Sequence, residues 1–424
     1  MKTDRPQASV LLTGDELLDG RVADTNGRYL SASLVERGAR VVAVTAVPDD
    51  AAIITAAVRS MLDDRVDVLV VSGGLGTTHD DLTMAAVAAA TRRPLVESEE
   101  AMSYIRRSAA DVARRRGWSF DEVLQAAARE ALLPHGAACI RPAGMAPGAL
   151  LQVDRSTVIV LPGVPRELEA MFPAVLDEVS ADWPRPDFLR ILRVYGVGEM
   201  AVSPLVDPML GPDLDVAVTI SDGEITLRVA GWGEAGSGHA RDLVRRLQDG
   251  LPVYSSDGRT IDDLVAGALL RRADSVAVAE SCTGGLLGGR LTDRPGSSEY
   301  FMGGIISYAN EVKASMLHVP EGMLAEFGAV SEQVAAAMAE GVREVIGTTW
   351  GLGTTGVAGP GGGTPEKPVG LVYLGCSGPA GTLVREHHCY GDRLTIRRQS
   401  AIAALHLFWD ALQAAEGPSV RRDG

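Results

Sequence analysis

Hydrophobic and polar positions follow one another in a way that predicts alternating strands and helices at the start of the chain. Apolar runs at 8–12 and 40–44 predict strands, and apolar residues at helical spacing are found at 26–37 and 50–63. Residues 67–71 are apolar almost without a break, as is typical of a central parallel strand that helices cover on both faces. Strands that alternate with helices in this way predict βαβ units with right-handed crossovers.

The pattern changes before the middle of the chain. A charged helical segment is expected at 97–133, and extended structure returns at 149–161. The proline-containing segment 182–186 is typical of a linker. Short apolar runs and one helical stretch follow it and predict a small α+β module, with strands at 191–195, 216–220 and 225–229 and a helix near Arg241.

A second series of strands and helices begins at Asp257. Residues 261–269 carry apolar side chains at helical spacing, 275–279 predict a buried strand, and Ser331 begins a helix that continues to about Ile346. Later patterns predict three more strands and a closing helix, at 352–355, 370–375, 383–388 and 395–415.

These patterns place the chain in the α/β class. Two three-layer α/β domains with largely parallel sheets are expected at residues 1–182 and 257–424, and the small α+β module joins them at 183–256. Ligands of such sheets bind beyond the carboxyl ends of the strands. Polar residues that follow predicted strands are therefore the candidates for chemistry.

Composition and charge narrow the possible functions. Of the 424 residues, 46% are hydrophobic and 22% are charged, which is an ordinary balance for a globular protein. The 55 acidic residues outnumber the 40 basic ones and give a formal net charge of −15, and the short basic run at 114–116 lies on a predicted helix. A surface of this sign repels phosphate backbones, so nucleic acid is not an expected partner.

The cysteines and the apolar runs indicate the compartment. The four cysteines form no CxxC pair, which favours a reducing cytosol over a disulfide framework or structural zinc; they are Cys139, Cys282, Cys376 and Cys389. No apolar stretch approaches the roughly 20 residues that a membrane span needs. The apolar run that follows residue 6 is too short for a secretory signal. We therefore expect a cytoplasmic protein with no membrane partner.

The strongest candidate site lies in the second α/β domain, where the strand at 275–279 leads into Glu280-Ser281-Cys282-Thr283-Gly284-Gly285. Small hydroxyl residues followed by glycines can direct backbone N–H groups toward an anion or a developing oxyanion at a helix N-terminus. A serine in such a segment is, taken alone, more often only a helix cap. Thr283, Gly284 and Gly285 are accordingly candidate binding residues beside Ser281.

Polar residues and glycines follow the other predicted strands of the same domain. Each of these segments alone is typical of a loop or a surface, but their placement at the strand ends of one domain favours a ligand site. Glycine loops let the backbone approach a ligand closely, and guanidinium groups can hold an anionic substrate. The candidates are Tyr308, Lys313, Thr355, Gly359, Gly361, Arg393 and Arg397.

The first α/β domain has candidates of a different kind. Adjacent carboxylates beside a glycine turn suit a divalent cation that bridges protein and phosphate oxygens, so Asp80 and Asp81 are candidate metal ligands. The alternative is that these two acids only cap the following helix. The candidate nucleotide-binding residues near them are Glu16, Asn26, Gly73, Gly74, Gly76 and Thr78.

These motifs resemble those of the CinA family (competence/damage-inducible protein A) over nearly the whole chain. The first half is similar to the family's molybdenum-cofactor-synthesis type domain in segments 14–18, 24–26, 73–76, 141–148 and 161–167. The last domain is similar to nicotinamide-nucleotide amidases in segments 279–285, 308–313 and 355–362.

For the last domain, the resemblance implies an amidase that converts nicotinamide mononucleotide into nicotinate mononucleotide and ammonia. Ser281 would be the nucleophile, with Tyr308 and Lys313 activating it. Thr355 would lie in the substrate pocket, and an arginine of the stretch 393–397 would help to hold the substrate. Amide hydrolysis also requires, on chemical grounds, an activated hydroxyl and an oxyanion hole. No histidine lies near these motifs, so a Ser-His-Asp triad is disfavoured, and no cofactor is expected for the amidase.

For the first domain, the resemblance implies hydrolysis of a nucleotide pyrophosphate with a divalent metal ion. ADP-ribose is the expected substrate, and NAD-like dinucleotides are a weaker hypothesis. Two residues depart from the family pattern, since Thr77 replaces the usual proline and Arg141 stands where asparagine is common. Thr77 should loosen the glycine turn, because proline would have preset its backbone. The family also implies a homodimer whose partners are small-molecule nucleotides.

Two other classes of function remain open. A molybdopterin-binding protein could use the first domain, but it would leave Ser281, Tyr308 and Lys313 without a role. A non-enzymatic competence or DNA-damage adaptor is opposed by the acidic surface and by the lack of a basic stripe.

Overall fold

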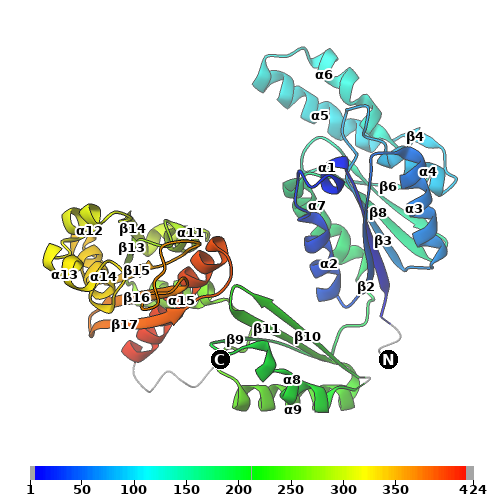
Figure 1. Cartoon of the computed structure of the whole chain (residues 1–424). Coiled ribbons are helices and arrows are strands. Elements are labelled where there is room, and N and C mark those ends of the chain that lie inside the picture. Colours follow the sequence, from blue (N-terminus) through cyan, green and yellow to red (C-terminus); the bar gives the residue numbers. More distant parts are fainter. Residues whose placement is uncertain (1–4, 212, 417–424) are drawn as a thin grey trace. The chain divides into compact units, whose positions relative to one another are not determined.

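The computed structural model describes residues 5–211 and 213–416, which form two compact units, Met1–Pro186 and Asp187–Gly424 (Figure 1). The first unit holds the first expected α/β domain. The second unit holds both the small module and the second α/β domain. The outer ends of the expected domains, residues 1–4 and 417–424, lie outside the described residues.

The first unit is built on a six-stranded sheet with the order β2-β1-β3-β8-β7-β6. Its four strands β2, β1, β3 and β8 are parallel, and β7 and β6 add an antiparallel edge. The strands are β1 (Gln7–Thr13), β2 (Arg40–Val47), β3 (Val68–Ser72), β6 (Ala138–Ile140), β7 (Gly148–Val153) and β8 (Ser156–Leu161). A separate pair joins β4 (Leu95–Glu97) to β5 (Leu132–Pro134). As the apolar run predicts, every residue of β3 is buried.

Helices cover both faces of this sheet, so the unit has three layers (Figure 1). Leu30 of α2 and Phe172 of α7 pack on one face, and Val58 of α3 and Val87 of α4 pack on the other. The helices are α1 (Asp15–Leu18), α2 (Asn26–Glu36), α3 (Ala51–Asp63), α4 (Thr83–Ala90), α5 (Glu99–Arg116), α6 (Phe120–Ala127) and α7 (Pro165–Val179).

The helical segment expected at 97–133 is not continuous. Helix α5 ends at Gly117, whose φ of 70° lies in the left-handed region that glycine adopts without strain. The chain then forms α6 and a short 3₁₀ turn, Ala128–Ala131, before it enters β5. This turn carries Arg129 and Glu130 into the region of the glycine turn.

The small module is a four-stranded antiparallel sheet with the order β10-β11-β9-β12, packed on the long helix α9. It has the α+β character that the pattern predicts. Its elements are β9 (Phe188–Tyr195), α8 (Ser203–Val206), β10 (Leu214–Ser221), β11 (Glu224–Gly231), α9 (Gly233–Gly250) and β12 (Val253–Ser255). The short strand β12 pairs with β9 only near Arg193 and Val194.

The second α/β domain is built on a five-stranded sheet with the order β14-β13-β15-β16-β17. Strand β13 is parallel to both of its neighbours, and β16 and β17 form an antiparallel edge. The strands are β13 (Val276–Glu280), β14 (Phe301–Ile306), β15 (Trp350–Gly356), β16 (Leu371–Gly378) and β17 (Gly381–His388). Both α/β sheets therefore have a parallel centre, as expected, and one antiparallel edge.

This domain also has three layers. Helices α10, α11 and α15 cover one face, and α12, α13 and α14 cover the other. Their bounds are α10 (Ile261–Arg272), α11 (Leu286–Thr292), α12 (Asn310–Leu317), α13 (Glu321–Phe327), α14 (Glu332–Ile346) and α15 (Arg393–Glu416). Thr260 begins α10 with a capping box shared with Asp263, which satisfies backbone N–H groups at the start of the helix.

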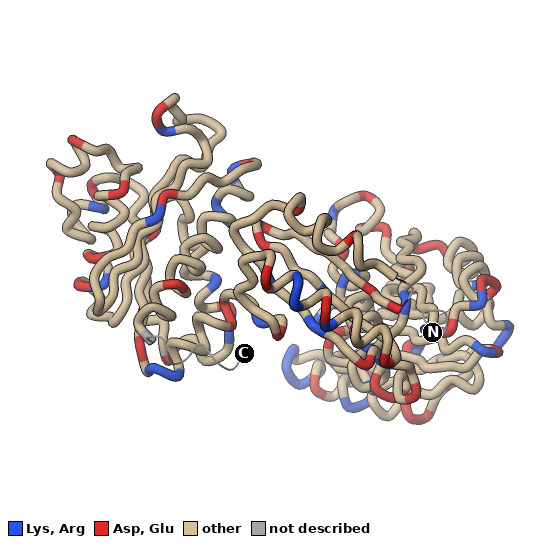
Figure 2. The backbone as a smooth tube through the Cα atoms, turned by 90° about the horizontal axis from the view of Figure 1, so that it is seen from below, with Lys and Arg blue, Asp and Glu red and all other residues tan. Residues whose placement is uncertain are grey.

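Charged residues of both signs are interspersed along the backbone of each unit (Figure 2). Within the described residues, no helix combines the length and the apolar character that crossing a membrane requires. All four cysteines are free thiols.

Candidate functional site

Ser281 follows the last residue of β13, at the carboxyl end of the central strand of the second α/β sheet. Because β14 and β15 run parallel to β13 on either side, their carboxyl ends lie beside it. The backbone N–H of Ser281 donates to the Thr354 carbonyl oxygen at 2.9 Å, and the Ser281 side chain is buried. The backbone of the predicted nucleophile is thus held against β15.

Lys313 approaches Ser281 from helix α12. Its Nζ lies 3.2 Å from Ser281 Oγ and donates to the carbonyl oxygens of Ser307 at 2.8 Å and Tyr308 at 3.2 Å. The side chain points back toward the start of its helix, as helical side chains do. Two residues that are 32 positions apart in sequence are therefore within hydrogen-bonding distance.

The surroundings of Lys313 favour its neutral amine. The residue is only 1% exposed, and no carboxylate within residues 5–211 and 213–416 forms an ion pair with it. Burial lowers the pKa of Lys313 below its usual value of 10.5, since the ammonium loses its hydration; the nearby Cys282 and Glu311 oppose this shift. A lysine must lose its proton before it can accept one from a hydroxyl.

Glu280 changes the expected anion site at the start of α11. Its buried carboxylate accepts the backbone N–H groups of Gly285 at 2.8 Å, Leu287 at 3.1 Å and Gly288 at 2.7 Å. A helix N-terminus offers such groups to an anion, and here a side chain of the protein already takes them. The sequence predicted that Gly285 would bind the substrate. Its N–H group already donates to Glu280 and is therefore not free to bind a substrate anion.

Three other backbone donors lie next to Ser281. The N–H groups of Cys282 and Thr283 face the Cys282 thiol, and in the described part of the chain the N–H group of Gly284 has no hydrogen-bond acceptor. Gly284 adopts a φ of 58°, and a Cβ at this position would lie 3.1 Å from Arg397 Nη2. The glycine thus permits both the turn and the close approach of the arginine, and its own N–H can serve a developing oxyanion.

Tyr308 occupies a different place from the one expected. Its backbone carbonyl accepts from Lys313, but its exposed phenol oxygen accepts from Arg393 Nη2 at 3.1 Å. No hydrogen bond among the described residues joins this phenol to Ser281 or Lys313. The side chain therefore cannot relay the serine proton in this arrangement, and it lies at the rim of the site with Arg393.

The two arginines hold different parts of the site. Arg393 is exposed and donates through Nη1 to the carbonyl oxygen of Gly359 at 2.6 Å, while Arg397 donates to the carbonyl oxygen of Thr283 at 2.8 Å. The contact between Arg397 and Thr283 spans 114 residues of sequence. Arg397 thus fixes the loop that follows Ser281, and Arg393 is the more accessible cation.

Two threonines expected in the pocket have hydroxyls with partners inside the protein. The Thr283 hydroxyl lies 2.7 Å from that of Thr354, and Thr355 Oγ1 donates to the Ala329 carbonyl oxygen at 2.7 Å. Both residues are buried. Their side chains hold the strand ends together, and Gly361 stands exposed in the loop beyond.

The glycine turn of the first unit is also shaped by close contacts. Gly73 has a φ of 114°, and a Cβ there would overlap the carbonyl oxygen of Thr13. Gly74 has a φ of 59°, and a Cβ there would lie 2.5 Å from the hydroxyl of Thr83. Only glycine allows the turn to pack this tightly against β1 and α4.

Other predicted residues of this unit tie neighbouring strand ends together. Asn26 Nδ2 donates to Ser72 Oγ at 3.2 Å and to the carbonyl oxygen of Gly163 at 2.8 Å. Glu16 and Asn26 line a small cavity of about 80 Å³. The structure thus brings these two predicted residues together, at the carboxyl ends of β1, β3 and β8.

The two acids that follow the glycine turn have unequal surroundings. Asp81 Oδ2 accepts both the backbone N–H of Thr78 at 2.8 Å and its hydroxyl at 2.6 Å, and it lies 3.7 Å from Arg129 Nη2. Asp80 is exposed. Asp81 therefore closes the turn, and neither acid is the N-cap of α4, which is Leu82.

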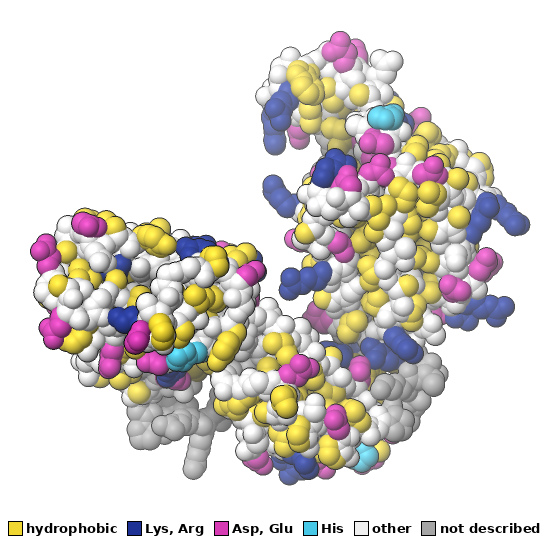
Figure 3. Space-filling view, in the orientation of Figure 1, with side chains coloured by type: hydrophobic (Ala, Val, Ile, Leu, Met, Phe, Trp, Pro, Cys, Tyr) yellow, Lys and Arg dark blue, Asp and Glu magenta, His cyan; other side chains and the backbone are white. Residues whose placement is uncertain are grey.

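Acidic side chains gather near α1, at the carboxyl ends of β1 and β2 (Figure 3). Burial, together with the charges of Asp15, Glu16 and Asp80, raises the pKa of Asp49. No three acidic, histidine or cysteine side chains of the described residues are placed to hold a metal ion. Since Asp81 already accepts two hydrogen bonds from Thr78, a divalent cation at this edge would need phosphate oxygens for most of its ligands.

Comparison with known proteins gives separate matches for the two α/β domains of the chain. Residues 9–181 match the family model "Probable molybdopterin binding domain", and residues 259–412 match "CinA C-terminal domain". A CinA-like protein of Frankia casuarinae is 40% identical over 422 residues, which cover 95% of each chain. The chain belongs to the CinA family.

Other members of the CinA family are similar to the same extent. A CinA-like protein of Mycobacterium marinum is 38% identical over 425 residues, which cover 96% of this chain and 98% of the relative. The crystal structure of the competence/damage inducible protein CihA of Agrobacterium tumefaciens is 40% identical, with a TM-score of 0.35, and covers 36% of this chain and 95% of its own.

At Thr77, where this member of the CinA family departs from the family pattern, the turn is held by other residues. Arg129 donates to the carbonyl oxygen of Gly76 at 3.1 Å and to that of Thr78. Asp81 holds the same turn through Thr78. The loosening expected from the loss of proline is therefore opposed by side-chain contacts.

Glu130 is a residue of interest that the sequence did not indicate. It lines a cavity of about 250 Å³ together with Gly74, Gly76, Asp81 and Arg129. The side chain is only 9% exposed, and its Oε2 has no hydrogen-bond partner among the described residues. Burial and the charge of Asp81 raise its pKa to about 7. A glutamate between Arg129 and Ala131 in a helical stretch carries no sequence signal for this environment.

Proposed function

We propose that the second unit is an amidase that hydrolyses nicotinamide mononucleotide to nicotinate mononucleotide and ammonia. The observation that carries this proposal is the buried Lys313 amine, 3.2 Å from Ser281 Oγ. A serine hydroxyl is a weak nucleophile unless a nearby base takes its proton during attack. Because burial lowers the pKa of Lys313, the lysine is suited to be that base.

The contacts of Lys313 also favour this direction of proton transfer. A neutral amine has two N–H groups and one lone pair, and the carbonyl oxygens of Ser307 and Tyr308 accept the two N–H groups. The lone pair is then directed to the remaining neighbour, the Ser281 hydroxyl. Two fixed acceptors therefore orient Lys313 as the recipient of the serine proton.

The reaction would run in two steps. Ser281 Oγ attacks the amide carbon while its proton moves to Lys313 Nζ, and Lys313 then gives a proton to the departing nitrogen, which leaves as ammonia. A water molecule, deprotonated by the same amine, hydrolyses the resulting ester and releases the carboxylate. The N–H group of Gly284 would stabilise the oxyanion in both steps.

Arg393 is suited to hold the phosphate of the substrate. Its guanidinium is exposed at the rim, and its contacts with Gly359 and Tyr308 fix its position. A fixed guanidinium recognises phosphate well because its N–H groups match the spacing of two oxygens. The substrate would then lie between this rim and Ser281.

Ammonia release from nicotinamide mononucleotide by the full chain tests the proposal. Ser281→Ala should lower the rate by more than about 1000-fold, because it removes the attacking oxygen. Ser298→Ala, at an exposed serine of the same domain, is the matched control and should leave the rate unchanged. A folded Ser281→Ala chain that keeps more than about a tenth of the rate would refute the nucleophile, since that deficit is only ~1.4 kcal/mol.

For the first unit we propose binding and hydrolysis of a nucleotide pyrophosphate, with ADP-ribose as the first substrate to test. The support is a glycine turn that faces a cavity and a group of carboxylates at neighbouring strand ends. Metal dependence is part of this proposal, and loss of ADP-ribose cleavage after chelation would support it. A pterin is the alternative ligand, favoured by the match of residues 9–181 to a molybdopterin-binding family.

We also propose that the protein forms a homodimer and is located in the cytoplasm. The free cysteines agree with a reducing compartment. Sedimentation of the full chain would test the dimer directly.

A further inference from the structure

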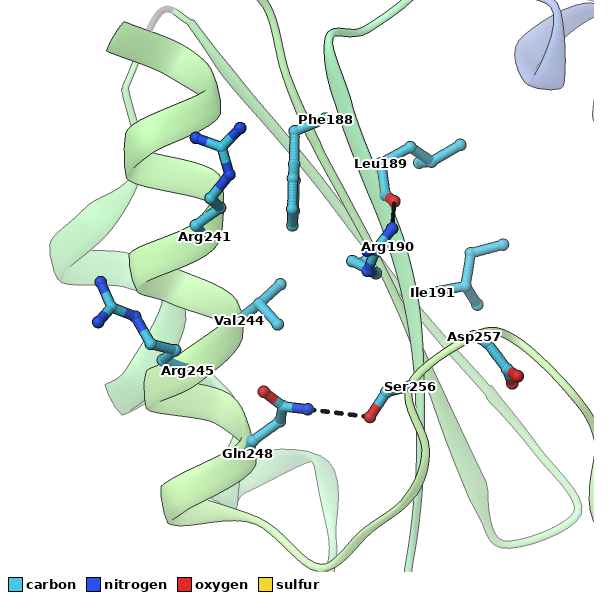
Figure 4. A pocket seen from close by; sticks show the side chains of 10 residues that line it. All are labelled: Phe188, Leu189, Arg190, Ile191, Arg241, Val244, Arg245, Gln248, Ser256 and Asp257. Atoms are coloured by element: carbon cyan, nitrogen blue, oxygen red, sulfur yellow. Dashed lines mark hydrogen bonds between the residues drawn. The ribbon is translucent and has the colours of Figure 1, made fainter. Parts of the chain in front are cut away.

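The small module carries a groove that neither proposed activity uses. It has a volume of about 690 Å³ and lies between helix α9 and strand β9 (Figure 4). Phe188, Arg190 and Ile191 line it from the strand, and Arg241 and Val244 line it from the helix. None of the residues of the two candidate sites takes part in it.

The groove follows from the way the sheet ends. Strand β9 pairs with β11 along its whole length, but β12 pairs only near Arg193 and Val194. No strand of the described residues therefore pairs with the other edge of β9 from Phe188 to Ile191. Side chains alternate along a strand, so Phe188 and Arg190 lie on the same face as Leu192 and Val194, which pack on α9.

Two positive charges in this groove have no acidic partner among residues 5–211 and 213–416. The guanidinium carbon of Arg190 lies 5.2 Å from the centre of the Phe188 ring, and that of Arg241 lies 5.5 Å from it. Neither arginine forms an ion pair with any of the residues that the structure describes. Figure 4 shows Phe188 and Arg241 facing each other between helix and strand.

The neighbouring charged residues of the groove form ion pairs with other residues. Arg245 forms an ion pair with Asp242 and bends away from the strand, and Asp257 lies 2.6 Å from Arg259. The groove therefore has an excess of positive charge in a chain whose net charge is −15. The two guanidinium groups pack on opposite sides of one aromatic ring, which limits their motion (Figure 4).

We propose that this groove is a binding site for a phosphorylated small molecule of nucleotide size. Arg241 and Arg190 would hold phosphate oxygens of the ligand on either side of the Phe188 ring, and the apolar part of the ligand would lie on Val244. Arginine pairs suit phosphate because each can donate two parallel hydrogen bonds. The volume is in the range of small-molecule sites, about 300 to 1,000 Å³.

The dimensions of the groove favour a small ligand over a polynucleotide. A polynucleotide would need a basic path that continues beyond two arginines. The other charged residues of α9 near the groove include two acids, Asp242 and Asp249, beside Arg246. The helix therefore does not extend the positive charge of the groove into a basic path. This site is independent of the amidase proposal, since it shares no residue with Ser281 or Lys313.

Chemical footprinting of the full chain tests the site directly. Phenylglyoxal modifies accessible guanidinium groups, and peptide mass spectrometry reports the rate at each arginine. ADP and inorganic pyrophosphate are the probes, because neither contains an amide that the amidase could hydrolyse. At about ten times its Kd, ADP should slow the modification of Arg190 and Arg241 roughly tenfold, since only the free fraction reacts.

Variants on the same helix separate the site from general effects. Arg241→Gln should raise the ADP concentration that protects Arg190 by about tenfold or more. Arg246→Gln is the matched control, since Arg246 is exposed on α9 outside the groove and donates to the Pro204 carbonyl oxygen. It should leave the protection of Arg190 unchanged.

Three results would overturn the proposal. One is that neither probe slows the modification of Arg190 or Arg241. Another is that ADP protects Arg246 as strongly as the two groove residues. The third is that a single-stranded oligonucleotide protects the groove while ADP and pyrophosphate do not, which would make it a polynucleotide site.

Discussion

Glu130 offers a quantitative test of the electrostatics of the first unit. Its carboxyl is buried beside Asp81, and one oxygen has no partner among the described residues. Glu130→Gln keeps the size of the side chain and removes the charge. We expect this substitution to stabilise the unit at high pH and to have little effect at low pH.

The expected magnitude follows from the pKa. Burial first, and then the charge of Asp81, raise the pKa of Glu130 from 4.5 to about 7. At ~1.4 kcal/mol per pKa unit, this difference corresponds to roughly 3 kcal/mol. The unfolded chain loses its proton first as the pH rises through 4.5, so the folded unit loses stability between 4.5 and about 7 and no more above that.

Calorimetry of the full chain measures this effect. At about pH 8, Glu130→Gln should raise the melting temperature of the first unit by roughly 6 to 12 °C, whereas near pH 4.5 the two proteins should melt together. Glu169→Gln, at an exposed carboxyl of α7, is the control and should show neither change. An equal shift of the melting temperature at both pH values would refute the reasoning. Removal of a buried charge can stabilise the unit only at a pH at which the Glu130 carboxyl is ionised.

Three further predictions concern the second unit. Lys313→Met should lower the amidase rate by more than about 100-fold, and the wild-type rate should rise with pH through a lysine pKa below 10.5, since only the neutral amine accepts a proton; a flat profile would contradict this. Glu280→Gln should destabilise the unit by about 1 to 3 kcal/mol in urea titrations, because an NH₂ group would face a backbone donor, while an unchanged midpoint would show that the three contacts are weak. A fragment that begins at Asp257 should melt below one that begins at Asp187, because it lacks Tyr195 and Glu224, which pack on His406 of α15; equal melting temperatures would show that the module adds nothing.

Much of the fold could be predicted from local patterns. The run at 67–71 identified the strand β3, and its position between β1 and β8 agrees with burial on both faces. The alternation of strands and helices identified the two parallel centres. The antiparallel edges formed by β16 and β17 were not foreseen, because an edge strand has the same local pattern in either direction.

The candidate site was predictable where motifs combine residue type with position at a strand end. Ser281 and Lys313 were named together, and the structure brings them within 3.2 Å. The roles of Tyr308 and Gly285 were not predictable in this way. The Tyr308 phenol contacts Arg393, which is 85 residues distant, and the Gly285 N–H is taken by Glu280.

Residue pattern by itself determined the elements, their class and the chemical groups that the strand ends carry, because these depend on periodicity and on residue type within short segments. Only the tertiary structure decided which groups are free. Asp81 is occupied by Thr78 and Arg129, Glu280 by three N–H groups, and Arg397 by Thr283. Such pairings depend on distances between distant segments, and the same distances set the burial that shifts the pKa values of Lys313 and Glu130.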